Sequence, residues 1–479
     1  MERILSNEQM RLADKFTINT LGISEQELIN RAGSALANEI KKRFAGGRVL
    51  VCVGKGNNGN DGRLLAQILS KTHGFSVATL NIYNGIFKLL DKKFDIIVDC
   101  IFGTGLDRNV EGKYKDAIEK INNSGAFIIS CDIPSGINGD SGLVMGCAIK
   151  ANLTIAIQEY KLGHFLNDGP DYCGQLACVD IGISIWGDEF AYRLTKQDVS
   201  NLFAKRIRNT HKGNFGKACV LGGSSCFPGS VLLSANAISA LKMGIGYCNI
   251  AVADSLMQFY VHKTPECTFT PLKSLDGKLL YDEFGLTNLL NFDSIAIGMG
   301  LTCSENVYNS IKFLLKNYKG TLIIDADGLN SLSKFGLDVL LNKSCKVVLT
   351  PHVGEFSRLS GLTKEEIINN FIQASKDFAK KYNVVLLLKS ATSVITDGEM
   401  VCLNTTGTSC LSKGGSGDIL SGIIAGITAR NNELFSDVAS SAFLLGIAGE
   451  ICSKKFNDYS TTPSEVIGCI HNAIDFLAD

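Results

Sequence analysis

Short apolar runs alternate with amphipathic stretches along the first part of the chain, and this alternation predicts a parallel α/β domain. Apolar residues at helical spacing predict two helices within residues 7–44, and a further helix is predicted at 63–71. Continuous apolar strands separated by helices indicate a parallel sheet covered on both faces. The strands are predicted at 48–54, 76–83, 94–100, 126–134 and 152–158.

A second α/β pattern begins beyond residue 205. Between 187 and 208 the apolar strand pattern stops and a polar amphipathic stretch, LTKQDVSNLFAKR, intervenes. Helices are predicted from about 229 to 243 and after Ser416, Leu434 and Thr462. No repeat is obvious, so two different α/β domains are expected, 1–205 and 206–479. The second set of strands is predicted at 217–223, 247–253, 293–299, 321–327, 345–351 and 384–390.

Composition narrows the class of protein. The chain has 479 residues, 45% hydrophobic and 20% charged, as expected for globular domains with sizeable cores. Its 47 basic residues are balanced by 47 acidic ones, which argues against nucleic acid as the main partner. The 16 cysteines are scattered and form no CxxC pair, which favours buried reduced thiols in a cytoplasmic protein.

Neither a signal peptide nor a membrane span is predicted. The N-terminus, MERILSNEQMRLADKF, carries charges throughout and has no apolar core of the kind a signal peptide needs. The longest apolar runs, at 384–388 and 442–445, are far shorter than the roughly 20 residues that cross a bilayer. A soluble, cytoplasmic protein without a membrane partner is therefore expected.

Two glycine-rich, acid-tipped segments carry the first chemical signal. These are GNNGNDG at 56–62 and KGGSGD at 413–418, and each precedes a predicted helix. Glycines let backbone N–H groups converge on an anion, and the helix N-terminus adds a partial positive charge. A tight turn with an Asp cap is the alternative for each segment taken alone.

Polar residues follow three predicted strands of the first domain. They lie at 54–62, at Asp99 with 102–106, and at 131–136. Ligands of open parallel sheets bind beyond the carboxyl ends of the strands. These segments offer carboxylates, amides and backbone N–H groups, which suit a phosphate-bearing ligand and a hard cation. The Rossmann GxGxxG form is absent from the first segment, and no His or Cys cluster could hold a transition metal.

GNNGNDG, VDCIFGTGL and CDIPSG, in this order behind a helical N-terminus, resemble the NAD(P)H-hydrate epimerase domain over essentially all of 1–205. That family has a Rossmann-like three-layer fold and inverts the stereocentre at the hydrated carbon of damaged NADH or NADPH. The resemblance implies that Asp132 is the catalytic acid/base and that K⁺ binds at Asn58, Asp99 and Ser135. The substrate-binding residues it implies are Asn57, Asn58, Gly59, Asn60, Asp61, Gly103, Thr104, Gly105, Leu106, Asp107 and Arg108.

One position departs from the pattern of that family. Asn60 stands where the family usually has glycine. If the position requires positive φ, Asn is the least strained replacement, so a preserved loop is expected.

The second domain also places polar residues after its predicted strands. Asp418 lies near the first turn of the helix that follows KGGSGD. A carboxylate beside bound phosphates is unfavourable unless it has a task, such as taking a proton from a nearby hydroxyl. A lone His is more often structural, but His352 follows a strand between Pro351 and Glu355 and is therefore a site candidate.

HKGNFG, the GG after the first strand, DADGLN, TPHVGEF and GGSGDILSG are similar to the nucleotide-dependent NAD(P)H-hydrate dehydratase domain, of ribokinase-like α/β fold, over about 206–479. In that family a nucleotide phosphorylates the hydroxyl of the hydrate, and loss of phosphate restores the nicotinamide. The resemblance implies Asp418 as the base, Gly300 and His352 on the substrate side, and ADP or ATP with Mg²⁺ as the co-substrate. The nucleotide-binding residues it implies are Lys389, Ser390, Ala391, Thr392, Ser393 and Gly417.

Two positions depart from this second pattern. Ser390 stands where glycine is common, and Thr302 ends a GMGLT run where the family tends to GPGLG. Both departures bear on individual contacts rather than on membership of the family.

Together the two resemblances predict a bifunctional enzyme that repairs hydrated NADH and NADPH. Two alternatives stay open: a ribokinase-type small-molecule kinase with an accessory N-terminal domain, and a non-catalytic nucleotide-binding protein. Asp132 and Asp418 both stand in their motifs, which favours catalysis. Both families commonly form homo-oligomers, so a homo-oligomer is expected. The preferences between ADP and ATP, and between the two hydrates, stay undecided.

Overall fold

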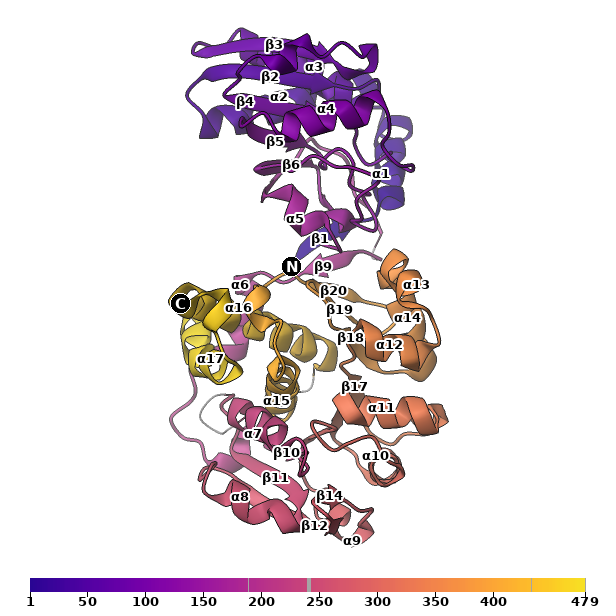
Figure 1. Cartoon of the computed structure of the whole chain (residues 1–479), viewed down its shortest axis with the longest axis vertical. Helices are drawn as coiled ribbons and strands as arrows, with labels where there is room; N and C mark the ends of the chain where they lie inside the picture. The colour runs from indigo at the N-terminus through magenta and orange to yellow at the C-terminus, as the bar shows by residue number, and fades with distance from the viewer. Residues whose placement is uncertain (188, 239–242, 432, 479) are drawn as a thin grey trace. The chain divides into compact units, whose positions relative to one another are not determined.

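The computed structural model describes residues 1–187, 189–238, 243–431 and 433–478. The chain forms two compact units, Arg3–Ala191 and Tyr192–Asp479, the latter with Met1–Glu2 (Figure 1). The division falls earlier than residue 205, where the sequence placed it, because β9 (Ala191–Arg193) lies beside β20 (Val401–Asn404) in the sheet of the C-terminal unit.

The N-terminal unit is built on a parallel sheet with the strand order β3-β2-β4-β5-β6-β8. The five strands predicted from apolar runs are confirmed, whereas the partly exposed β8 was not predicted. The order reverses between β2 and β4, which is the place where open α/β sheets bind ligands. The strands are β2 (Gly47–Val53), β3 (Phe75–Asn81), β4 (Ile96–Cys100), β5 (Phe127–Cys131), β6 (Leu153–Ile157) and β8 (Gln175–Val179).

Helices cover both faces of this sheet, giving the expected three layers (Figure 1). Leu50 and Cys52 of β2 pack with buried residues of α4 in one core cluster. On the opposite face, Gly62 of α3 lies against Val53 and Cys100. The helices are α1 (Asn7–Asn19), α2 (Glu25–Arg43), α3 (Asn57–Ser70), α4 (Lys113–Asn122) and α5 (Gly169–Cys173), with short strands β1 (Glu2–Leu5) and β7 (Tyr160–Lys161) paired in parallel.

The prediction that GNNGNDG is a loop was wrong, because α3 already begins at Asn57. Its glycines permit close packing: a Cβ on Gly59 would lie 2.2 Å from the carbonyl oxygen of Gly54, and one on Gly62 would lie 2.7 Å from Cys100 Sγ. Asn60 is helical and not at positive φ, so the strain considered for it does not arise. Its Oδ1 accepts a hydrogen bond of 2.9 Å from Arg63.

The C-terminal unit has its own sheet, in which the strands from β12 to β18 are parallel and β18, β19 and β20 are antiparallel. Its six predicted strands are confirmed. The strands β12, β19 and β20 were not predicted. The order is β12 (Thr268–Leu272), β11 (Tyr247–Ala253), β10 (Lys217–Leu221), β15 (Ser294–Ile297), β16 (Thr321–Ile324), β17 (Lys346–Leu349), β18 (Val385–Leu388), β19 (Ser393–Thr396) and β20.

An apolar helical layer covers this sheet, with α15 buried along most of its length. The helices predicted after Ser416, Leu434 and Thr462 are confirmed as α15, α16 and α17. The helix predicted at 229–243 is present as α7, while residues 239–242 lie outside the described residues. The helices are α7 (Pro228–Ile238), α10 (Glu305–Asn317), α11 (Ala326–Phe335), α12 (Val353–Ser360), α13 (Lys364–Asn369), α14 (Phe371–Tyr382), α15 (Ser416–Thr428), α16 (Leu434–Ser460) and α17 (Pro463–Ala478), with shorter α6 (Lys196–Ser200), α8 (Met257–Val261), α9 (Glu283–Thr287), β13 (Ser274–Leu275) and β14 (Lys278–Leu279).

Helix α16 is the one described helix that is long and apolar enough to cross a membrane, judged by length and composition alone. The most apolar part of this helix has a mean hydropathy of 1.4, and 72% of that part is buried inside the protein. The helix therefore has the burial of a core helix, and the non-helical backbone of Asn457 (φ 64°) interrupts it near its end.

Two candidate active sites

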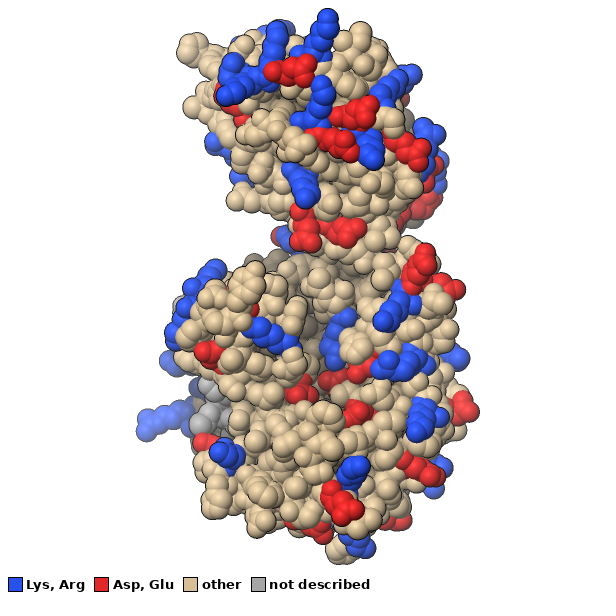
Figure 2. Space-filling view, in the orientation of Figure 1, with Lys and Arg blue, Asp and Glu red and all other residues tan. Residues whose placement is uncertain are grey.

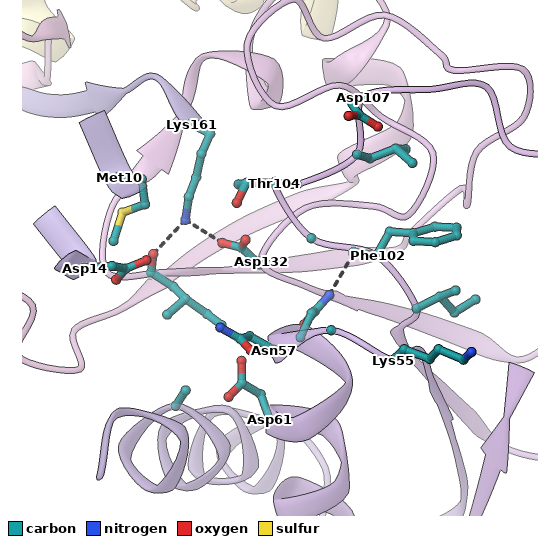
Figure 3. Close-up of a pocket in the computed structure, with 18 of the residues that line it drawn as sticks. Met10, Asp14, Lys55, Asn57, Asp61, Phe102, Thr104, Asp107, Asp132 and Lys161 are labelled. Atoms are coloured by element: carbon teal, nitrogen blue, oxygen red, sulfur yellow. Dashed lines mark hydrogen bonds and ion pairs between the residues drawn. The ribbon is translucent and has the colours of Figure 1, made fainter. Parts of the chain in front are cut away.

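A cavity of about 860 Å³ opens at the reversal point of the N-terminal sheet (Figure 3). It is lined by the segments that follow β2, β4 and β5, together with α1 and α2. Its volume lies in the range of small-molecule sites. Of the residues predicted to bind substrate, the structure brings Asn57, Asn58, Asp61 and 103–108 to this cavity. Gly59 and Asn60 do not line it, because their contacts lie within α3 and the end of β2.

Asp132 lies at the end of β5 and faces the cavity with left-handed backbone, φ 69°. Its carboxylate forms an ion pair with Lys161, whose Nζ also donates 2.7 Å to the carbonyl of Ile157. The backbone carbonyl of Asp132 accepts 2.8 Å from His164 Nε2, and His164 Nδ1 accepts 2.9 Å from the backbone N–H of Lys161. These bonds assign His164 the neutral form with its proton on Nε2.

The three residues Asp132, Lys161 and His164 thus form a closed ring of interactions, which we call the Asp132 clamp. Lys161 is 1% and His164 0% exposed, so both are held inside the unit. A non-glycine residue at positive φ is uncommon and is kept only where its surroundings over-determine it. The clamp provides that constraint. Lys161 and His164 were missed from the sequence, although they follow the predicted strand 152–158 as polar residues in the run QEYKLGH.

Two more carboxylates face the same cavity, Asp14 from α1 and Asp61 from α3 (Figure 3). Burial raises the pKa of Asp61 to about 7, helped by the nearby charges of Asp132 and Asp14. Burial also raises the pKa of Asp14 to about 6, although the Lys161 ammonium opposes the change. Near neutral pH both groups therefore exchange protons readily.

Of the three residues predicted to bind K⁺, Asn58 lines the cavity, whereas the buried Asp99 and Ser135 do not; Asn58 Nδ2 and Ser135 Oγ both donate to the carbonyl of Phe102. Asp99 is fully buried, and its two oxygens accept hydrogen bonds from Ile101 N–H, Ser130 Oγ, Ser135 N–H and Ser135 Oγ. Asn58 Nδ2 donates to the carbonyls of Phe102 (2.8 Å) and Cys131 (3.1 Å). Asn58 Oδ1 is buried and accepts no hydrogen bond from any residue that the structure describes. No group of three or more His, Cys, Asp or Glu able to hold a metal occurs in the described part of the chain.

The second site lies where β16, β18 and α15 approach one another in the C-terminal unit. Figure 2 shows acidic and basic side chains gathered in a hollow of this unit between α15 and α12. Lys389 Nζ donates 2.8 Å to Asp325 Oδ1, and Ser421 Oγ donates 2.8 Å to Asp325 Oδ2. Helix α15 begins after Gly415 (φ 103°), and a Cβ on Gly417 would lie 3.3 Å from Lys389 Nζ. Asp325 belongs to the DADGLN motif noted in the sequence, where it was given no role.

Asp418 stands in the first turn of α15 beside this ion pair. Burial raises its pKa to about 7, and the Asp325 carboxylate adds to the rise. A hydrogen bond from Ser230 and the positive charge of Lys389 oppose it. A carboxylate of this pKa is half protonated at neutral pH, which suits a general base near its working pH.

The remaining predicted residues of this half border the same strand ends. His352 caps α12 through Nδ1, accepts from the backbone N–H groups of Gly354 and Glu355, and keeps a half-exposed side chain. The run 389–392 forms the turn between β18 and β19, and the Lys389 N–H donates 2.8 Å to the carbonyl of Pro351. Ser390 is not at positive φ, so replacing glycine there introduces no backbone strain.

Gly300 and Thr302 both occupy left-handed backbone, at φ 68° and 65°. This conformation is uncommon for a β-branched residue. The Thr302 N–H donates 2.8 Å to Asp327 Oδ2, which anchors the strained turn. The departure at Thr302 therefore keeps the backbone shape that glycine would adopt freely.

Comparison with known protein families gives one match for each half of the chain. Residues 218–472 match the family described as NAD(P)H-hydrate dehydratase. Residues 25–90 and 83–163 match the family described as YjeF-related protein N-terminus.

Relatives of similar length cover both halves. The chain is 30% identical to a bifunctional NAD(P)H-hydrate repair enzyme Nnr of Thermofilum pendens, over 98% of this chain and 96% of that protein. It is 31% identical to the enzyme of the same name from Dictyoglomus turgidum, over 99% and 98%.

Solved structures match the C-terminal unit. An ADP/ATP-dependent NAD(P)H-hydrate dehydratase from Bacillus subtilis, crystallised with ATP and Mg²⁺, is 25% identical with a TM-score of 0.51, covering 60% of this chain and 99% of that one. A ribokinase-like superfamily protein from Enterococcus faecalis, 23% identical, has a TM-score of 0.51 over 62% and 99%. The expected ribokinase-like fold is thereby confirmed.

Proposed function

Because the chain belongs to the family of bifunctional NAD(P)H-hydrate repair enzymes, we propose that its two units act in succession on one damaged cofactor. The N-terminal unit interconverts the R and S hydrates of NADH and NADPH. The C-terminal unit uses a nucleotide to dehydrate the S epimer back to NAD(P)H. The observation that carries this proposal is that each unit independently presents a buried aspartate cluster at its strand ends.

In the N-terminal unit, Asp132 acts as the acid/base at the hydrated carbon. The Asp132 clamp fixes its carboxylate toward the cavity and places the Lys161 ammonium beside it. The diphosphate of the substrate fits the N-terminus of α3, where Lys55, Gly56 and Asn57 line the cavity. The loop 103–108 closes the opposite wall.

The residues Asn58, Asp99 and Ser135 fit a K⁺ ion, because the buried Asn58 Oδ1 has no hydrogen-bond partner among the described residues and because Asp99 and Ser135, which are hydrogen-bonded to each other, supply further oxygen atoms. A bound K⁺ would fix the segments after β4 and β5 against α3. Replacing K⁺ with choline should then lower the melting temperature of the wild type but not that of Asn58→Leu. Equal melting temperatures of the wild type in both salts would count against this ion site.

In the C-terminal unit, Asp418 takes the proton of the substrate hydroxyl while that oxygen attacks the terminal phosphorus of the nucleotide. Lys389, Gly417 and the turn 389–393 hold the nucleotide, with Gly300 and His352 on the substrate side. Mg²⁺ bound with the phosphates supplies charge neutralisation. Departure of phosphate breaks the C–O bond, and loss of a proton from the neighbouring carbon restores the double bond.

A mixed sample of R and S NADH-hydrate tests the proposal directly. With ADP or ATP and Mg²⁺, the protein should restore the absorbance of NADH for the whole sample. Asp418→Ala should abolish this recovery while leaving epimerisation intact. Asp132→Ala should leave only about half of the sample repaired quickly. If neither nucleotide supports any recovery, the assignment fails and a small-molecule kinase becomes the better hypothesis.

We further propose a cytoplasmic homo-oligomer. All 16 cysteines are free thiols, and most of them are buried, which agrees with a reducing compartment. Sedimentation of the purified chain would test the oligomeric state, and a monomer at micromolar concentration would refute it.

A further inference from the structure

Asp61 is an acidic group of the cavity to which the proposed function gives no chemical step. Its side chain is only 8% exposed and points from α3 into the cavity (Figure 3). Among the described residues, no side chain or backbone group forms a hydrogen bond with its carboxylate. A buried carboxylate without a partner is unfavourable for folding, so its place at a ligand cavity points to a task.

The charges around Asp61 help to explain why its pKa is raised. Asp132 faces it from the end of β5, Asp14 from α1 and Lys161 from β7. Lys161 is paired with Asp132 and its charge also acts on Asp14, whereas no positive charge is close enough to lower the pKa of Asp61. The other charged residues of the cavity wall are Glu25, Lys55, Asp107, Arg108 and Glu111.

Asp132 is therefore paired with the ammonium of Lys161, whereas Asp61 is buried without an ion-pair partner. Burial raises the pKa of Asp61 to about 7, so it carries a proton about half of the time at neutral pH. Two carboxyl groups in different environments within one site are the usual arrangement for an acid and a base.

We propose that Asp61 is a second catalytic residue of the epimerisation, acting as the acid while Asp132 acts as the base. The inference rests on the proposed epimerase function and adds a residue role to it. Inversion requires the hydroxyl to leave one face of the hydrated carbon and to return on the other. Two groups on different walls of the cavity can serve the two faces, whereas a single aspartate serves one.

The chemistry balances with water as the only co-reactant. Hydration of the enamine double bond of NAD(P)H leaves the hydroxyl on the carbon next to the ring nitrogen. Asp61 protonates this hydroxyl, the C–O bond breaks, water leaves, and the nitrogen lone pair forms a C=N bond. A water molecule then adds to the other face of the carbon while Asp132 takes its proton, and the electron pair returns to nitrogen.

The cycle leaves the proton on Asp132 and none on Asp61, which is the state required to invert the opposite epimer. Exchange with solvent restores the first state. One pair of aspartates therefore serves both directions of the reaction, as an epimerase requires.

Asp61→Asn tests the role, because asparagine keeps the shape of the side chain but cannot supply a proton. Asp116→Asn, an exposed carboxylate on α4 outside the cavity, is the matched control. We expect kcat for epimerisation to fall at least ~100-fold with KM changed less than about threefold. Asp61→Glu should recover part of the lost kcat. Dehydration of the pure S epimer by the same preparations should be unchanged and reports that the chain is folded.

The pH profile and an isotope separate this role from simple binding. The wild-type rate should fall as pH rises through about 7, where Asp61 loses its proton, and Asp61→Asn should lose that limb. Each inversion in water labelled with heavy oxygen should place the label on the product hydroxyl.

Wild-type kcat and an unchanged pH profile in Asp61→Asn, or inverted product without label, would overturn the inference while the epimerase assignment stands. Absence of epimerisation in the wild type would instead remove the proposed function itself.

Discussion

Replacing Asp418 by asparagine should abolish dehydration and at the same time stabilise the C-terminal unit. In the folded protein the pKa of Asp418 rises from its ordinary 3.8 to about 7, with burial as the main cause and the Asp325 carboxylate as the second. The fold therefore favours the protonated form of this side chain. Asparagine resembles that form and carries no charge at any pH, so it removes the unfavourable ionisation.

The stabilisation that Asp418→Asn provides increases with pH. Below pH 3.8 both the folded and unfolded states bind the proton, and the wild type suffers no penalty. The penalty grows as pH rises between the two pKa values, and above about 7 it is complete. The full rise in pKa corresponds to about 4 kcal/mol, and solvent screening of this partly exposed group reduces the expected gain to about 2 kcal/mol.

Denaturant unfolding at pH 4 and pH 8 measures this gain in the free energy of unfolding. Trp186, the single tryptophan of the chain, lies in the N-terminal unit, so a transition seen by circular dichroism but not by tryptophan fluorescence belongs to the C-terminal unit. Asp418→Asn should shift that transition to higher denaturant at pH 8 and much less at pH 4. A shift that is absent, or equal at both pH values, would refute the reasoning. Unchanged epimerisation is the functional control.

Three further substitutions test other parts of the structure. Lys161→Met should lower the epimerisation rate at least ~100-fold and leave dehydration intact, because Asp132 loses its buried partner. Equal epimerisation rates in the variant and the wild type would exclude the Asp132 clamp from catalysis. Asp325→Asn should lower the pKa of Asp418, so the pH below which the dehydration rate falls should become more acidic. An unchanged pH profile would show that Asp325 does not influence the pKa of Asp418. Thr302→Gly should relieve left-handed strain and raise the unfolding free energy by ~0.5–1 kcal/mol in the same denaturant assay, whereas destabilisation would show that the Thr side chain is needed.

Most of the fold could be predicted from the sequence, because the strands of a parallel sheet are buried on both faces and read as continuous apolar runs. The strands β8 and β12 were missed because they are only partly buried. The strands β19 and β20 were missed because polar residues at their ends shorten their apolar runs. The start of α3 was misjudged for a different reason. Its glycines suggested a turn, whereas they allow the helix to approach the end of β2 and Cys100 closely.

The aspartates proposed as catalytic stand in local motifs of the sequence, whereas the residues that contact them could not be predicted. Lys161 and Asp14 stand in none of the motifs quoted from the sequence, and Asp325 stands in DADGLN, a different motif from that of Asp418. Lys161 reaches Asp132 only because β5 and β6 are neighbours in the sheet, and Asp325 reaches Asp418 only because β16 ends beside the start of α15. Such contacts between distant segments depend on the strand order, which periodicity does not reveal.

The two sites reach the same electrostatic arrangement on different folds. In each, an aspartate with a pKa of about 7 lies close to a second aspartate that is paired with a buried or half-buried lysine: Asp61 beside Asp132–Lys161, and Asp418 beside Asp325–Lys389. A carboxyl group that is half protonated at neutral pH can give or take a proton with equal ease. In the proposed mechanism the first unit uses this property in both directions, because it interconverts two epimers, whereas the second unit uses it to accept a proton. Both steps therefore depend on groups that titrate near pH 7, which lets one chain carry out the whole repair at a single cellular pH.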